Sequence, residues 1–124
     1  MAVSACFLLM SVDAHAQTKT RVRFPAGTHG TAVKGKVRGY AYRDYVVGAS
    51  GGQSMNVSID ASNSSTVFTI FTPAGSNPEE AAETNGYRGK LSDSGDYVIR
   101  VLMMRSAARR KGAVSNYTLK ISIK

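Results

Sequence analysis

Residues 117–124 are Tyr117-Thr118-Leu119-Lys120-Ile121-Ser122-Ile123-Lys124, and apolar and polar side chains alternate along them without a break. Successive side chains of a β-strand point to opposite faces of its sheet, so this pattern predicts a strand with one buried face and one wet face. Residues 55–60 repeat the pattern, with Met55, Val57 and Ile59 as the apolar set. The chain is therefore expected to contain sheets that are solvated on one side.

Six further segments alternate less regularly and raise the prediction to about eight strands. They are residues 20–24, 31–37, 42–49, 66–72, 87–91 and 97–103. Clusters of Gly, Pro, Ser and Asn separate the segments, and the gaps leave no room for helical crossovers between parallel strands. We predict an all-β, single-domain fold, a β-sandwich or jelly-roll-like arrangement of about eight antiparallel strands with one or two short helical turns.

The first 16 residues have the features of an export signal. An apolar run at residues 6–10 precedes Ala14-His15-Ala16, the small-x-small pattern that signal peptidase cuts after. We predict a signal peptide at residues 1–16 and a β-sandwich domain at residues 17–124; because no Lys or Arg precedes Lys19, a start upstream of Met1 stays open. The alternatives are a buried N-terminal helix and a lipid anchor at Cys6. The run is shorter than the roughly 20 apolar residues that span a bilayer, so no stable membrane insertion is expected.

Composition narrows the class of protein. The 124 residues include 16 Lys and Arg against 8 Asp and Glu, for a net charge of +8, and a single Cys. Loss of residues 1–16 removes Cys6 and Asp13, so the exported chain has no cysteine and a charge of +9. One cysteine forms neither an intramolecular disulfide nor a thiolate metal site. An exported domain without disulfides is typical of a bacterial envelope, and we predict a periplasmic protein.

Residues suited to catalysis are scarce. His29 is the single histidine after residue 16, and it lies in a Gly- and Thr-rich segment without a partner nearby in sequence. The acidic cluster Glu79, Glu80 and Glu83 fits a solvated helix start, capped by Asn77 with Pro78 as the first helical residue, better than a calcium loop or a catalytic carboxylate pair. We therefore predict no catalytic residue, no metal and no cofactor. The chain is expected to be a binding protein and not an enzyme.

Two basic and aromatic clusters are the candidate binding residues. Arg105 and Arg109 are four residues apart in a segment, 105–111, that Gly112 would end, so in a helix both guanidinium groups leave one face, with Arg110 beside them. In residues 38–45, Tyr40 and Tyr42 alternate with arginines, a composition associated with binding hot spots. The alternative is that these residues have no binding role, because arginines are common on protein surfaces and strand tyrosines often only pack against their neighbours.

Five motifs in this order resemble a known family. They are Gly39-Tyr40-Ala41-Tyr42-Arg43-Asp44-Tyr45, Gly52-Gln53-Ser54-Met55-Asn56-Val57-Ser58-Ile59, Ser94-Gly95-Asp96-Tyr97-Val98-Ile99-Arg100-Val101-Leu102, Arg105-Ser106-Ala107-Ala108-Arg109 and the final Tyr117–Lys124. Together they resemble the periplasmic inhibitors of goose-type (g-type) lysozyme, over residues 22–124. The segment from Tyr45 to Ile59 alone also resembles the bacterial pre-peptidase C-terminal β-sandwich.

The resemblance implies a monomeric β-sandwich that binds a host g-type lysozyme and blocks its peptidoglycan-cleaving cleft. In that family a tyrosine and two arginines make the contact, and they match Tyr40, Arg105 and Arg109 here. Tyr42 and Arg110 are possible secondary contacts. In other lysozyme-inhibitor families a motif similar to Ser94-Gly95-Asp96-Tyr97 enters the cleft, but strand alternation here puts Tyr97 on the core face, which indicates a structural turn.

Two other functions stay open. The charge would suit a basic module that binds anionic envelope polymers or nucleic acid. Against this, the basic residues do not form one continuous stripe in the sequence and most aromatic residues occupy core-facing positions, so no nucleic-acid partner is expected. The third possibility is an accessory domain of the pre-peptidase C-terminal type, but no catalytic domain is attached.

Overall fold

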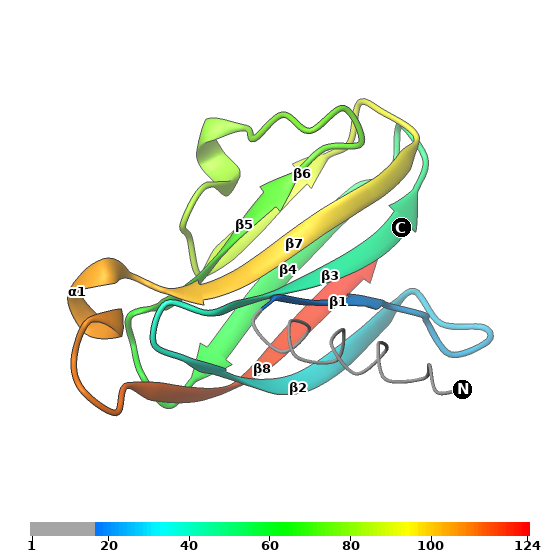
Figure 1. Ribbon diagram of the computed structural model, residues 1–124. Coiled ribbons are helices and arrows are strands. Elements are labelled where there is room, and N and C mark those ends of the chain that lie inside the picture. The colour runs from blue at the N-terminus through cyan, green and yellow to red at the C-terminus, as the bar shows by residue number, and fades with distance from the viewer. Residues whose placement is uncertain (1–16) are drawn as a thin grey trace, which may run out of the picture.

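The computed structural model describes residues 17–124, and the predicted signal peptide lies outside the described residues. Eight strands form two four-stranded sheets packed face to face (Figure 1). The strands are β1 (Gln17–Arg21), β2 (Gly30–Arg38), β3 (Tyr42–Ala49), β4 (Ser54–Ala61), β5 (Thr66–Phe71), β6 (Gly86–Lys90), β7 (Gly95–Met103) and β8 (Val114–Ile123). The helical elements are α1 (Arg105–Ala108) and a 3₁₀ turn, Glu79–Ala81. The predicted all-β sandwich is confirmed. In the described part of the chain, no helix has the length and hydrophobicity of a membrane span.

The strands divide between two sheets that are named here by a central strand. The β7 sheet has the order β1-β3-β7-β5, and the β8 sheet has the order β2-β8-β4-β6. The strand pairs are antiparallel, as predicted, except for β1 with β3, which is parallel. The reason is the path of the chain: it leaves the β7 sheet after β1, runs back along β2 in the β8 sheet, and reverses once more before β3 pairs with β1.

The first strand is also displaced from its predicted place. The sequence pattern predicts a strand at residues 20–24, whereas β1 is Gln17–Arg21. Its sequence, QTKTR, contains no apolar residue, so no alternation marks it. Backbone pairing with β3 defines this strand instead, and Val22 continues the pairing by donating its N–H to the Val46 carbonyl at 2.8 Å.

The core fills the space between the sheets with every second residue of the central strands. On β7, Tyr97, Ile99, Val101 and Met103 are buried, and on β8, Tyr117, Leu119, Ile121 and Ile123 are buried. The Tyr45 and Tyr117 hydroxyls, one from each sheet, lie 2.6 Å apart in a hydrogen bond, and the two rings meet edge to face. Burial, followed by this hydrogen bond, raises the pKa of Tyr117 well above its ordinary value. The polar pair therefore stays neutral and joins the sheets inside the core.

The segment after β5 covers the edge of the β7 sheet. Phe68 and Thr84 exchange two backbone hydrogen bonds, of 2.8 and 2.9 Å, so the free edge of β5 is paired. The helix predicted at residues 77–83 is shorter than expected, a single 3₁₀ turn. Asn77 does not cap it, since its side-chain amide donates to the Ile70 carbonyl at 2.9 Å, and Glu83 has a positive φ of 44°.

Candidate functional site

The helix α1 links β7 to β8 at one end of the sandwich (Figure 1). The Met104 N–H donates to the Ser65 carbonyl at 2.9 Å, and Ala108 is buried, so the helix is fixed to the body at both ends. The Arg109 N–H donates to the Arg105 carbonyl at 3.1 Å. This bond places the two arginines one turn apart on the same side of the helix, and both side chains are exposed.

The sequence explains both ends of α1. Ala107 and Ala108 favour helix, and Gly112, with φ of +74°, accepts the left-handed conformation that turns the chain into β8. Regular helix covers only Arg105–Ala108, and residues 109–112 form turns, so the predicted segment 105–111 is helical over its first four residues. The side chains of Arg109, Arg110 and Lys111 are all exposed on these turns.

The turn between β2 and β3 lies against α1. The Gly39 N–H donates to the Ala113 carbonyl at 3.0 Å, and a Cβ atom placed on Gly39 would lie 3.9 Å from the Ala108 carbonyl oxygen. Gly39 has φ of +54°, a conformation that most other residues adopt only with strain. Tyr40 follows it at the turn and is 66% exposed. The turn therefore presents Tyr40 at the same end of the molecule as the α1 arginines.

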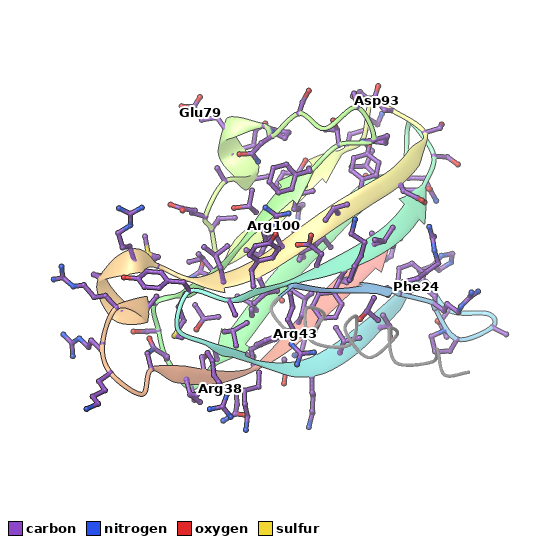
Figure 2. All side chains as sticks on the ribbon, in the orientation of Figure 1. Phe24, Arg38, Arg43, Glu79, Asp93 and Arg100 are labelled. Carbon is purple, nitrogen blue, oxygen red and sulfur yellow. The ribbon has the colours of Figure 1, made fainter. Side chains whose placement is uncertain are left out.

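We call the exposed set Tyr40, Met104, Arg105, Arg109 and Arg110 the α1 tip. Among residues 17–124, the exposed large hydrophobic side chains are Tyr40 and Met104, the latter 40% exposed, and both belong to this set. Figure 2 shows nitrogen-tipped side chains spreading outward from α1 and the loop after it, with Arg38 at the same end. No Asp or Glu follows Asp96 in the sequence, so the α1 segment carries no acidic side chain of its own. The α1 tip is a convex, cationic surface with an apolar component.

Sequence reasoning missed Met104, although a signal exists. Met103 ends the inward-facing series of β7 and is buried. β7 ends at Met103, and Met104 is the extended residue before α1, so the alternation of β7 continues through it and predicts an outward side chain, in agreement with its exposure.

Tyr42 has a different environment from Tyr40. It is half-buried, and the Arg100 guanidinium lies over its ring at 4.0 Å from the ring centre and at 5.1 Å from that of Phe71. Arg100 also makes two hydrogen bonds to the Asp44 carboxylate, of 2.8 and 3.0 Å. These bonds raise the pKa of Arg100, outweighing the opposing effect of burial. In Figure 2 Arg100 lies over the middle of the β7 sheet, so Tyr42 is engaged with the body of the protein.

The residues considered for catalysis are spread over the surface. His29 is exposed, and within residues 17–124 no three His, Cys, Asp or Glu side chains converge as metal ligands would. Glu79 and Glu80 are exposed on the 3₁₀ turn, at the top of Figure 2. Burial, and then the charge of Glu80, raise the pKa of the neighbouring Tyr87. The arrangement fits a solvated turn.

Three solved structures are similar to this chain over most of its length. The Aeromonas hydrophila PliG, a periplasmic lysozyme inhibitor of g-type lysozyme, has a TM-score of 0.76 and 33% identity, with 87% of this chain and 97% of that chain covered. A mutant of the Escherichia coli PliG has a TM-score of 0.70 and 31% identity over 88% and 100% of the two chains. The Salmonella Typhimurium PliG gives 0.70 and 30% over 86% and 98%. This chain belongs to the PliG family.

The three similar PliG proteins are inhibitors and not enzymes, which confirms the prediction that this chain is not an enzyme. No protein-family model and no curated protein matches the chain. The pre-peptidase C-terminal domain of a Bacillus anthracis collagenase is also similar, with a TM-score of 0.54 and 14% identity over 86% of this chain and 94% of that domain. At that identity the likeness shows the shared sandwich fold alone.

In this PliG-family protein the Ser94-Gly95-Asp96-Tyr97 motif leads from a turn into β7, with Tyr97 on the core face as strand alternation predicts. Tyr97 is 2% exposed, and its hydroxyl donates to the Asp93 carbonyl at 2.8 Å. The Ser94 hydroxyl accepts the Gly51 N–H at 2.9 Å. Both side chains are used in holding the turn before β7.

Proposed function

We propose that this protein is a periplasmic inhibitor of g-type lysozyme that blocks the lysozyme's active-site cleft with Tyr40, Arg105 and Arg109. The observation that carries the proposal is the α1 tip, in which two arginines one turn apart and an exposed tyrosine occupy one end of a rigid sandwich. Membership of the PliG family, whose named members are g-type lysozyme inhibitors, gives the target.

The chemistry of the α1 tip suits a glycosidase cleft. Such clefts are built around one or two acidic side chains, one of which serves as general acid. A guanidinium group can form two parallel hydrogen bonds with a carboxylate, and exclusion of water from the cleft strengthens them. Arg105 and Arg109 would supply these groups without competing carboxylates on their own helix.

The apolar residues of the α1 tip add contact area. Tyr40 offers a rigid ring with a hydroxyl at its end, and Met104 offers a flexible thioether that adapts to an uneven wall. Both are already exposed, so they bury apolar surface on binding without opening the core. Arg110 would act as a secondary contact at the rim. Tyr42 would contribute mainly by holding Arg100 and the start of β3.

The inhibition needs no catalysis, metal or cofactor. The α1 tip would occupy the groove that the glycan strand needs, and the backbone contacts of Met104 and Gly39 would keep the tip in place. We propose that one copy acts alone on one lysozyme molecule. Residues 1–16 would direct export to the periplasm and be removed there.

Measured affinities of single variants test the site. Loss of one partner of a desolvated charge pair at an interface costs about 2–5 kcal/mol, so Arg105→Ala and Arg109→Ala should each weaken binding to a g-type lysozyme at least tenfold. Tyr40→Ala should also weaken it, since exposed central aromatics are frequent hot spots. Binding would be followed by calorimetry, with circular dichroism to verify folding.

A matched control separates local contact from total charge. Arg88→Ala removes one arginine from the exposed face of β6 and should leave the affinity unchanged within about twofold. If both α1 variants fold and bind as tightly as the unmodified protein, the proposed site is wrong. If Arg88→Ala weakens binding as much as they do, the effect is one of net charge.

A further inference from the structure

The outer face of the β8 sheet gathers basic residues that are scattered in the sequence. Side chains of even number on its strands point away from the core, because their odd-numbered neighbours are the ones buried on β4 and β8. Six exposed cations occupy this face. They are Lys34, Lys36 and Arg38 on β2, Lys120 on β8, and Arg88 and Lys90 on β6. Asp60 on β4 is the one acidic residue on this face of the described sheet.

Strand register sets the spacing of these cations. Ala32 is paired with Lys120, and Lys120 with Ser58, so Lys120 lies on the strand next to the β2 series. Residues two apart on a strand are about 7 Å apart, and neighbouring strands are about 4.8 Å apart. Arg88 on β6 is in register with Gly30 through Asn56 and Ser122, so it lies about 14 Å across the sheet and about 13 Å along it from Lys34. The cations therefore form two groups on this face, one on β2 and β8 and the other on β6.

The two faces of the sandwich differ in how their charges are compensated. On the β7 sheet, Arg100 is paired with Asp44 and Arg21 with Asp96. These are the ion pairs found among residues 17–124, so none of the six cations of the β8 sheet has an acidic partner within the described chain. The outer face of the β8 sheet thus carries six cations against the single carboxylate of Asp60.

The floor between the cations is polar and hollowed. Two shallow hollows, of about 440 and 370 Å³, follow one another along β8. Lys34, Asn116 and Thr118 line the first, and Lys120, Asn56 and Ser122 line the second. The side chains of both hollows offer hydroxyl, amide and ammonium groups, and the first hollow also contains the Asp60 carboxylate. An elongated ligand lying along β8 would meet hydrogen-bonding groups below it and cations at its sides.

We propose that the outer face of the β8 sheet binds a glycan strand that bears carboxylate groups, the chemistry of the peptidoglycan that a lysozyme cleaves. The choice of polymer rests on the proposed function; the choice of an anionic glycan rests on the charge and on the row of hydroxyl and amide side chains. Sugar hydroxyls pair with Ser, Thr and Asn, and carboxylates pair with Lys and Arg.

Other polyanions fit this face less well. Proteins that bind single-stranded nucleic acids stack bases on aromatic side chains, and no even-numbered position of β2, β4, β6 or β8 is aromatic. Insertion into a lipid surface needs large apolar side chains on the contacting face, whereas the exposed Tyr40 and Met104 belong to the α1 tip. A carboxylate-bearing glycan can be held by hydrogen bonds and ion pairs, which this face offers.

The position of the outer β8-sheet face relative to the α1 tip connects glycan binding with inhibition of lysozyme. The α1 tip is at the end of the sandwich, and the cations of the β8 sheet other than Arg38 lie along its broad side, so a ligand on that side would leave the α1 tip accessible (Figure 1). Adsorption on the wall polymer would raise the local concentration of the inhibitor at the substrate of its target.

Sedimentation with purified peptidoglycan sacculi, without lysozyme, tests the proposal. The protein should co-sediment at physiological salt, and chemical amidation of the sacculus carboxylates should abolish this. The triple variant Lys34→Gln/Lys36→Gln/Lys120→Gln should lose roughly tenfold in affinity, since each exposed ion pair accounts for a small factor. The matched triple variant Arg105→Gln/Arg109→Gln/Arg110→Gln, with the same change in charge, should stay within about twofold of the unmodified protein.

Three results would overturn the proposal. They are no co-sedimentation of the unmodified protein, equal losses in the two triple variants, and tighter binding to duplex DNA or to anionic phospholipid vesicles than to sacculi. The β8-sheet variant should keep its affinity for g-type lysozyme in solution. A failure of sacculus binding is thereby distinguished from a failure of the proposed inhibitor function.

Discussion

Gly35 lies on β2 directly opposite Tyr117, where the hydroxyls of Tyr45 and Tyr117 join the two sheets. A Cβ atom at this position would overlap the Tyr117 hydroxyl and lie 2.9 Å from the Tyr45 hydroxyl. Overpacking a core typically costs about 1–3 kcal/mol, and separating the two buried hydroxyls adds about 1–3 kcal/mol. Alanine recovers about 0.5–1 kcal/mol relative to glycine in a strand. Gly35→Ala should therefore lower the free energy of unfolding by about 3 kcal/mol.

Urea unfolding followed by circular dichroism measures this change, and the thermal midpoint should fall by about 12 °C for a domain of this size. The double variant Gly35→Ala/Tyr117→Phe removes the hydroxyl that the new methyl group meets. It should be more stable than the sum of the single changes predicts, by about 1 kcal/mol. If Gly35→Ala is as stable as the unmodified protein, or if the two changes are simply additive, the packing described here is wrong.

Two further predictions concern charge and pH. Asp44→Ala should lower the free energy of unfolding by about 1–3 kcal/mol, because the buried carboxylate holds Arg100 through two hydrogen bonds. Asp96→Ala, in the exposed pair with Arg21, should lower it by less than about 1 kcal/mol. Equal losses in urea unfolding would contradict the difference in burial between the two pairs. The raised pKa of Tyr117 means that the folded state retains a proton that the unfolded state loses above about pH 10, so stability should be constant below that pH and fall by up to about 1.4 kcal/mol per pH unit above it. Unfolding midpoints at stepwise alkaline pH measure this, and the same slope in Tyr45→Phe/Tyr117→Phe would rule out the pair as its cause.

The strands could be predicted wherever one face is buried. β3 occupies residues 42–49, as the pattern predicts, and Met55, Val57 and Leu119 lie in the core. The position of β1 could not be predicted because its sequence has no apolar residue. Pairing with β3 defines this strand instead. The parallel β1–β3 pair depends on which sheet each strand joins, and local alternation carries no information on that.

The candidate site shows the same division between local and long-range information. The four-residue spacing of Arg105 and Arg109 and the stop at Gly112 are local, so the sequence could predict the short helix. The contact between the Gly39 turn and α1 depends on a hydrogen bond to Ala113, 74 positions later in the chain, which only the folded sandwich brings about. The basic residues of the β8 sheet are not contiguous in the sequence. The strand order β2-β8-β4-β6 brings them onto one face, and local sequence does not predict that order.

Inhibition of cell-wall lysis by g-, c- and i-type lysozymes, titrated in parallel with the purified protein, tests the central claim most directly. The account predicts that g-type activity falls in proportion to the added protein and is abolished near one equivalent, while the other two lysozymes retain activity at the same concentration. Undiminished g-type activity at a large excess of protein would contradict the account. An equal fall for all three lysozymes would contradict it as well, because that result would indicate masking of the cell wall and not blockage of one enzyme's cleft.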